Sequence, residues 1–323
     1  MCTAITYKTK NSYFGRNLDW EHSFGEEITI TPRNFPLTFK KLDTIKTHYA
    51  IIGMAITKSN YPLYFDAVNE MGLCAAGLIF PDNAFYNNVL ENHDNIAPFE
   101  LIPWILAKCS SVNDAKELLS NANIVNISFD ENLKLSPLHW IISDKNCSIT
   151  VEPLKSGLKI YENPIGVLTN NPTFDVQMLN LSNYMTLSNT DPENNFSNLE
   201  LHPYCRGMGT INLPGGVASP QRFVRAAFLK SNSISGSSEE ESVNQFFHIL
   251  NGVSHQRGCL KVCEGKYEIT IYSSCCNTDK CIYYYTTYEN THISGVDLYK
   301  ENIDGKQIIN YPLIRKPKFL IQN

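Results

Sequence analysis

The sequence predicts an α+β fold in which β-sheets are covered by helices. Strand-like segments occur at both ends of the chain, and helical segments lie in pairs between them. No glycine-rich phosphate loop follows a strand, so a nucleotide-binding fold has no support. With 323 residues and 43% apolar residues, the chain is long enough for one large domain or two ordinary ones, each with a buried core.

The first expected element is a hairpin over residues 2–19. The chain alternates between apolar and polar residues, turns through polar residues near Lys10, and then resumes a strand. This register places Cys2 opposite Leu18, with Arg16 diagonally across on the same face. A shift of one residue would reverse the face, so the position of the turn decides which side chains meet Cys2.

The later elements follow from hydrophobic periodicity in chain order. Strands are expected at residues 49–56, 63–67, 74–80, 138–143, 148–152, 158–161 and 167–169. Helices are expected at residues 98–108, 112–121, 219–230 and 240–250. Ser219 is expected to cap the third of these helices, with Pro220 in its first turn. The chain from residue 267 onward is rich in strand-forming and aromatic residues.

Residues 180–219 are rich in Asn, Ser, Pro and Gly and predict an extended excursion from the fold. The net charge of −5 argues against a nucleic-acid partner, because such surfaces are normally basic. No apolar run approaches membrane-spanning length, so no membrane partner is expected. The first twenty residues lack the apolar core of a secretory signal. A cytoplasmic location is therefore expected.

The ten cysteines predict reduced thiols rather than a disulfide scaffold. Cys259 and Cys263 form one local cluster, and Cys275, Cys276 and Cys281 form another. A structural zinc site would need paired short spacings with a turn between the ligands. The adjacent pair in the second cluster lies in a strand pattern, where neighbouring side chains point to opposite faces. We expect packing residues here, and neither a metal nor a cofactor.

Cys2 follows the initiator Met1 directly. If Met1 is removed, one residue carries both a thiol and a free α-amine. A thiol has a reference pKa of about 8.5, and an α-amine of about 7.7–8 can act as its base. A nucleophile and its base then occupy a single position without a catalytic histidine. The alternative is that Cys2 is simply a small residue at a start site.

Such a nucleophile needs further groups around it. Asp19 could anchor the amine, Arg16 could favour the thiolate, and the Asn170 amide could donate to the oxyanion that forms on the attacked carbonyl. Asp19 lies three residues beyond Arg16, so a bulge or the strand end must bring it near Cys2. The alternatives are an exposed ion pair for Arg16 and Asp19, and a plain turn at residues 170–172.

Short motifs recur in one order along nearly the whole chain. They are MCT at residues 1–3, FGRNLD at 14–19, NEMGL at 69–73, AGL at 76–78, GVLTNNPTFD at 166–175, LPGG at 213–216, SPQRF at 219–223 and YYYTTY at 283–288. In these motifs the chain resembles the choloylglycine hydrolase family, which contains bile salt hydrolases and penicillin V acylases. The block at 283–288 is more similar to clostridial-type bile salt hydrolases than to acylases.

The resemblance implies a four-layer αββα sandwich of the N-terminal nucleophile hydrolase type, formed by residues 1–323 as a single domain. It implies Cys2 as the nucleophile after removal of Met1, with Arg16 and Asp19 organising it. It also implies a homotetramer, with residues 180–219 as an assembly element.

The resemblance assigns three further residues to the site. Asn170 donates to the oxyanion from its side chain, and Arg222 completes the polar shell. The alternative for Arg222 is a surface charge. Ile79 supplies a backbone N–H to the oxyanion hole, at a position where bile salt hydrolases usually have asparagine and penicillin V acylases tyrosine. Because a backbone donor survives any side chain, this departure bears on the substrate more than on the reaction.

The expected substrate is a glycine- or taurine-conjugated bile acid. Residues 23–27, 56–65 and 129–138 are candidates for the walls of an apolar cleft. The same chemistry on penicillin V or an acyl-homoserine lactone is the nearest alternative. A non-catalytic ligand-binding relative, or a thiol-based metal or redox protein, are alternatives of other classes.

Overall fold

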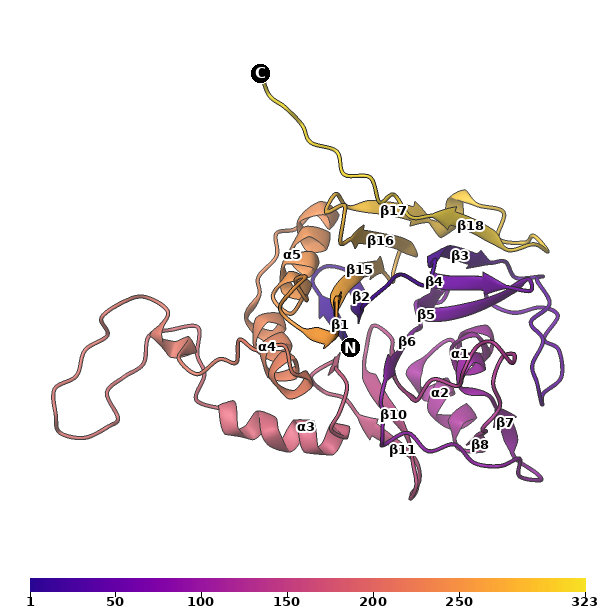
Figure 1. The fold of residues 1–323 in the computed structure, drawn as a ribbon, viewed down its shortest axis with the longest axis horizontal. Coiled ribbons are helices and arrows are strands. Elements are labelled where there is room, and N and C mark those ends of the chain that lie inside the picture. The colour runs from indigo at the N-terminus through magenta and orange to yellow at the C-terminus, as the bar shows by residue number, and fades with distance from the viewer.

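A computed structural model describes residues 1–323 and shows two β-sheets packed face to face between two groups of helices (Figure 1). Across the six-stranded sheet the order is β12 (Val167–Leu168), β1 (Cys2–Lys8), β2 (Ser12–Trp20), β15 (Ile269–Asn277), β16 (Ile282–Thr287) and β17 (Ser294–Asp297). Across the eight-stranded sheet it is β11 (Gly157–Glu162), β10 (Ser148–Leu154), β9 (Leu138–Ser143), β6 (Cys74–Ile79), β5 (Tyr61–Asn69), β4 (Ile51–Lys58), β3 (Glu27–Thr31) and β18 (Ile309–Pro312).

Helices cover the outer face of each sheet. They are α1 (Leu101–Lys108), α2 (Val112–Leu119), α3 (Phe174–Leu181), α4 (Ser219–Asn232) and α5 (Glu239–Asn251). Helix α4 packs on β1 and β12, and α5 on β15, whereas α1 packs on β5 and β6 on the other side (Figure 1). Two small sheets complete the fold, β7 (Asp94–Ile96) with β8 (Ala122–Ile124) and β13 (Lys261–Cys263) with β14 (Lys266–Tyr267). The predicted αββα sandwich is confirmed.

The eight-stranded sheet is buried on both faces, and its period of two divides its side chains between two cores. Ile52 and Ala76 belong to the cluster that includes the six-stranded sheet. Their chain neighbours Ile51 and Ala75 belong to the cluster that includes α1 and α2. Because both faces are covered, these strands show long apolar runs rather than simple alternation.

The predicted strands and helices are present with ends shifted by a few residues. The missed elements include β3, α3 and the short strands β7, β8 and β13. The prediction that Ser219 caps its helix is wrong. The cap is Ala218, with Ser219 as the first helical residue and Pro220 as the second. The Ser219 hydroxyl instead accepts a hydrogen bond from the backbone N–H of Asn170 at 2.8 Å.

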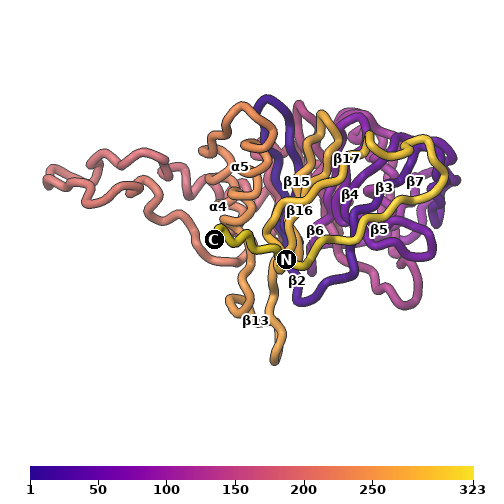
Figure 2. The backbone as a smooth tube through the Cα atoms, turned by 90° about the horizontal axis from the view of Figure 1, so that it is seen from above, coloured from indigo at the N-terminus to yellow at the C-terminus, as the bar shows by residue number.

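Three of the five clustered cysteines are packing residues as predicted: Cys275, Cys276 and Cys281 lie in the core. The prediction is wrong for Cys259 and Cys263, which are exposed. They lie at the β13–β14 hairpin, which projects from the body (Figure 2), so their side chains have no core to enter.

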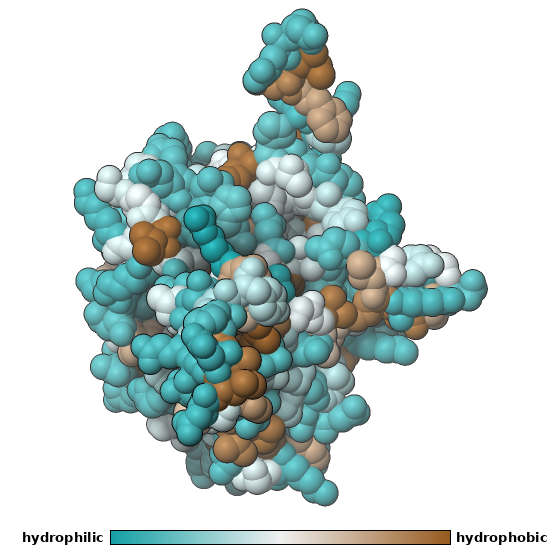
Figure 3. All heavy atoms as spheres, turned by 90° about the vertical axis from the view of Figure 1, so that its left-hand side faces the viewer, coloured by the Kyte–Doolittle hydropathy of each residue, from teal (hydrophilic) through white to brown (hydrophobic).

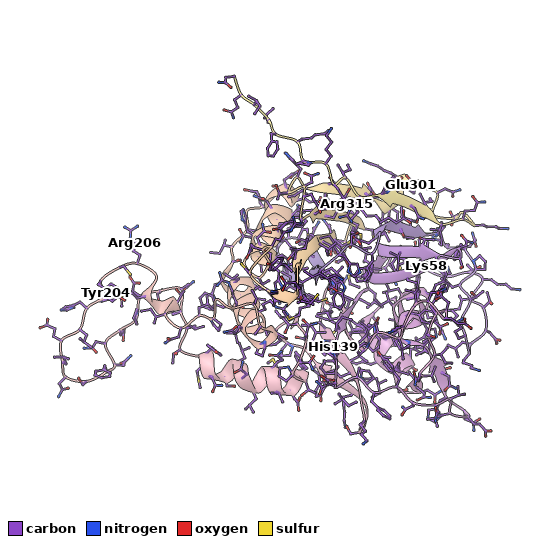
Figure 4. The ribbon with its side chains drawn as sticks, viewed as in Figure 1. Lys58, His139, Tyr204, Arg206, Glu301 and Arg315 are labelled. Atoms are coloured by element: carbon purple, nitrogen blue, oxygen red, sulfur yellow. The ribbon has the colours of Figure 1, made fainter.

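Most of residues 180–219 form a segment that leaves the body beyond α3 (Figure 1). Tyr204 and Arg206 lie in its outer part, away from the sheets (Figure 4). Apolar side chains along it face solvent (Figure 3); they include Met185, Phe196, Leu199, Leu201 and Tyr204. None of the helices combines the length and the apolar character that a membrane crossing would need.

Candidate active site

The N-terminal hairpin sets the position of the expected nucleophile. β1 and β2 pair with Cys2 opposite Leu18 and Ala4 opposite Arg16, which is the predicted register. Cys2 and Arg16 therefore point to one face of the six-stranded sheet, two positions apart along the hairpin. Cys2 is buried, with 2% of its surface exposed.

Asp19 lies in the same region, near the end of β2 and opposite a bulge in β15. β15 pairs Thr270 with Asp19 and Tyr272 with Leu18, so one extra residue of β15 lies between these pairs. The Asp19 carboxylate accepts a hydrogen bond from the Thr270 hydroxyl at 2.6 Å, and its other oxygen lies 4.0 Å from Nη1 of Arg222. The sequence indicated that a bulge or the strand end was needed; Asp19 is the last residue but one of β2, and a bulge lies opposite it on β15.

Arg16 is completely buried between the sheets. Its Nη1 donates to the backbone carbonyls of Phe65 and Gly77, while Nη2 has no hydrogen-bond partner. Burial alone would lower the pKa of Arg16, but electrostatic interaction with the acidic groups of Cys2, Tyr272, Asp66 and Asp19 raises it above its ordinary value. Arg16 is thus a permanent cation with a free N–H in the pocket that contains Cys2.

Asn170 and Arg222 bind the backbone of Cys2. The Cys2 N–H donates to Oδ1 of Asn170 at 2.8 Å, and Nη2 of Arg222 donates to the same oxygen at 2.8 Å. Nη1 of Arg222 donates to the Cys2 carbonyl and to the Thr3 hydroxyl. Arg222 is 1% exposed, so it is no surface charge, and burial lowers its pKa from the ordinary value.

Ile79 offers a free backbone N–H beside Asn170. Phe80 donates to the carbonyl of Pro137 at 2.8 Å, and Ile79 faces Leu138 across β6 and β9. Because hydrogen-bonded and non-bonded pairs alternate in an antiparallel ladder, the Ile79 N–H and carbonyl point away from β9. The pairing of β5 with β6 ends before this point. Nδ2 of Asn170 donates to the Ile79 carbonyl at 2.7 Å, which places the two amide groups at one edge.

An apolar cavity of about 240 Å³ opens onto these residues. Cys2, Arg16, Asp19 and Ile79 line it together with apolar side chains that include Trp20, Phe24, Ile56, Leu63, Phe65, Phe99, Ile102, Phe129, Leu133, Leu135 and Leu138. Most of these apolar side chains come from the three segments that the sequence indicated, residues 23–27, 56–65 and 129–138, whereas Trp20, Phe99 and Ile102 lie outside them. The cavity suits an apolar molecule that carries a reactive carbonyl at one end.

The α-ammonium of Met1 occupies an acidic pocket next to the site. It binds the Glu268 carboxylate and the backbone carbonyl of Asp19. Glu268, Asp19 and His255 are all buried, and their ligand atoms lie within 4.8 Å of one another. These three groups have the chemistry to hold a cation, and the cation in this structure is the chain's own N-terminus.

Asp66 on β5 forms a second buried acidic centre. Its carboxylate accepts hydrogen bonds from the hydroxyls of Tyr272 at 2.6 Å, Ser274 at 2.9 Å and Tyr283. Burial raises the pKa of Asp66, whereas the Arg16 guanidinium and these hydroxyls act to lower it. Asp66 thus interacts electrostatically with the buried cation Arg16.

All six residues singled out in the sequence come together around Cys2. Sequence reasoning missed Asp66, His255, Glu268 and Thr3, which contact or flank them. Thr3 directly follows Cys2 and lies in the MCT motif, whereas no local signal marks Asp66, His255 and Glu268, because each is far from Cys2 in the chain. The one available hint was the aromatic run at residues 283–288, which contains a partner of Asp66.

Comparison with known proteins gives one family. Residues 2–311 match the family described as linear amide C–N hydrolases, choloylglycine hydrolase family. The chain is 53% identical to a bile salt hydrolase/transferase of Lactiplantibacillus plantarum, with 100% of both chains covered. It is 42% identical to a bile salt hydrolase/transferase of Clostridium perfringens, with 96% of both covered. A crystal structure of a mutant conjugated bile acid hydrolase from Clostridium perfringens matches with a TM-score of 0.92 and 40% identity, covering 100% of both chains.

Proposed function

Because the chain belongs to the choloylglycine hydrolase family of linear amide C–N hydrolases, we propose that it hydrolyses the amide bond of glycine- or taurine-conjugated bile acids. The observation that carries the substrate is the apolar cavity that ends at Cys2. A steroid body matches such walls, and its acyl carbonyl would lie at the polar end. The names of the relatives support the same substrate class.

The proposed reaction begins once Met1 has left. The Cys2 nitrogen becomes an α-amine that keeps its hydrogen bond to Oδ1 of Asn170. It takes the proton of the Cys2 thiol, and the sulfur attacks the amide carbonyl carbon. Nη2 of Arg16, which has no other partner, lies in the same pocket and favours the thiolate.

The oxyanion then receives the Ile79 N–H and the second N–H of the Asn170 amide, whose first N–H binds the Ile79 carbonyl. The tetrahedral intermediate breaks its C–N bond, and the leaving amine takes the proton from the α-ammonium. Water attacks the resulting thioester and gives its proton to the same amine. The C–S bond breaks, the free bile acid leaves, and Cys2 regains its proton.

The test is a parallel substrate panel of taurocholate, glycocholate, penicillin V and an acyl-homoserine lactone with the purified enzyme. We expect the two bile acid conjugates to have the highest kcat/KM of the panel, with release of glycine or taurine. Cleavage of penicillin V alone would contradict the bile acid assignment but leave the reaction type intact. Mass spectrometry of the N-terminus belongs to the same experiment, since retained Met1 without turnover would favour a non-catalytic ligand-binding protein.

Acyl transfer to an amine is a second candidate, favoured by the word transferase in the names of two relatives. A thioester on Cys2 reacts with an amine as it does with water, and a new amide replaces the free acid. Incubation with taurocholate and excess of another amino acid, followed by mass spectrometry, tests this. Free bile acid as the sole product would exclude transfer to that amine.

We also propose a homotetramer in the cytoplasm, with each chain forming a single domain and residues 180–219 acting as the assembly element. The exposed apolar side chains of this segment support it, since a monomer gains nothing by exposing them. Replacing Phe196 and Tyr204 with serine should yield a smaller particle in light scattering. An unchanged particle mass would remove the segment from the interface. Cell fractionation tests the location, and a single unfolding transition of the smaller particle tests the single domain.

A further inference from the structure

A buried histidine touches the chain on both sides of the expected oxyanion hole. His139 on β9 and Glu152 on β10 are both completely buried (His139 is labelled in Figure 4). Nδ1 of His139 lies 3.2 Å from Oε1 of Glu152, and Nε2 lies 2.8 Å from the carbonyl oxygen of Thr169. Thr169 directly precedes Asn170 in the chain.

The same imidazole contacts the other side of the hole. Its ring stacks on Phe80 with centroids 4.1 Å apart and an interplanar angle of 5°. Phe80 directly follows Ile79, and its N–H is held by Pro137. One buried side chain therefore lies between the ring of Phe80, which follows Ile79, and the carbonyl of Thr169, which precedes Asn170.

The hydrogen bonds define how many protons the His139–Glu152 pair holds. The Thr169 carbonyl only accepts, so Nε2 of His139 carries a hydrogen. Between Nδ1 and Glu152 there is then one further proton, on the imidazole or on the carboxyl group, and either form keeps both hydrogen bonds. Glu152 also accepts from the backbone N–H of Phe174 at 3.0 Å, which ties the pair to the start of α3.

Neither residue lines the apolar cavity or contacts Cys2. Burial of such a polar pair costs free energy through desolvation, so the pair is expected to have a role beyond stability. We propose that His139, oriented by Glu152, is a positioning residue that sets the separation between the Ile79 N–H and the Asn170 amide, and so shapes the oxyanion hole. This inference rests on the proposed hydrolysis by Cys2.

The test uses the full chain and the double variant His139→Phe/Glu152→Gln. Phenylalanine keeps the volume and the stack on Phe80 but removes both hydrogen bonds, and glutamine leaves no unpaired buried charge while still accepting from Phe174. Because a misplaced donor weakens only the transition state, kcat should fall by about 10- to 100-fold with KM within about twofold.

Two further readouts separate positioning from general damage. A bile acid aldehyde forms a tetrahedral adduct with Cys2, and its affinity should fall by the same factor as kcat. Alkylation of Cys2 by iodoacetamide needs no oxyanion hole, and its rate should stay within about twofold. His139→Gln, which can still donate to the Thr169 carbonyl, should recover most of kcat.

His48→Phe is the matched control. His48 is also a buried histidine, held by the carbonyls of Tyr49 and Phe35, and it is absent from the cavity lining. It should leave kcat and aldehyde affinity unchanged. An equal loss of kcat in this control, or unchanged kcat and aldehyde affinity in the double variant, would overturn the inference. If the double variant does not fold, Glu152→Gln alone takes its place, and wild-type kcat there overturns it as well.

The outcome is separable from the substrate assignment. If wild-type enzyme cleaves penicillin V and no bile acid conjugate, the proposed substrate fails, and the same kcat comparison is made on penicillin V with a matching acyl aldehyde. If Cys2→Ala still turns over substrate, the proposed mechanism fails, and the inference fails with it.

Discussion

Acidification is expected to destabilise the fold through His255. The side chain is 1% exposed, and neither ring nitrogen has a hydrogen-bond partner. Nε2 lies 3.9 Å from Asp19 and Nδ1 lies 3.6 Å from Glu268. Burial lowers the pKa of His255 from 6.5 to about 4, with Asp19 acting to raise it and the charges of Arg222 and the N-terminus acting to lower it.

The sign and size follow from proton linkage. The folded-state pKa lies below the unfolded value, so the unfolded chain binds more protons between pH 6.5 and about pH 4. The contribution of neutral His255 is therefore complete above pH 6.5 and is lost as the pH falls through this window. At about 1.4 kcal/mol per pH unit, the free energy of unfolding should fall by about 3 kcal/mol from this residue alone.

Urea unfolding of the wild type and His255→Gln at pH 7.5, 6.5, 5.5 and 4.5 measures this loss. The carboxylates titrate in both proteins, so the difference between their stability curves isolates His255. As the pH falls from 7.5 to 4.5, the free energy of unfolding of the wild type should fall by about 3 kcal/mol relative to that of His255→Gln. His93→Gln, at an exposed histidine, serves as the control and should follow the wild type. Parallel curves for wild type and His255→Gln would refute the reasoning.

Three further outcomes are expected. Cys2→Ala should lose all turnover while circular dichroism stays native, and measurable hydrolysis would remove the mechanism. Asp66→Asn should lower the free energy of unfolding in urea by about 3–5 kcal/mol, because it leaves the buried Arg16 without its nearby charge; a change below about 1 kcal/mol would contradict this. Gly15→Ala would place a Cβ 2.0 Å from the Ser274 carbonyl oxygen between β2 and β15. The free energy of unfolding should therefore fall by about 3 kcal/mol, or no folded protein should form. A native melting temperature would contradict the close approach.

The sequence by itself determined the parts of the site that depend on local geometry. A short polar turn and a period of two set the register of the N-terminal hairpin, and Cys2 lies opposite Leu18 as predicted. The period of two also located most other strands, and the helical period of 3.6 located most helices. The motifs around Cys2, Asn170 and Arg222 indicated the reaction class through their resemblance to the choloylglycine hydrolase family, and a residue that carries both a thiol and an α-amine is consistent with it.

Only the tertiary structure decided how distant strands complete this site. The bulge that places Thr270 opposite Asp19 lies on β15, far along the chain. The free N–H of Ile79 depends on where β5 stops pairing with β6. Asp66, His139, His255 and Glu268 show no pattern of their own, and Ser219 serves Asn170 rather than its helix. Contacts of this kind join residues up to 267 positions apart, so they depend on the pairing and packing of both sheets at once, which no local periodicity encodes.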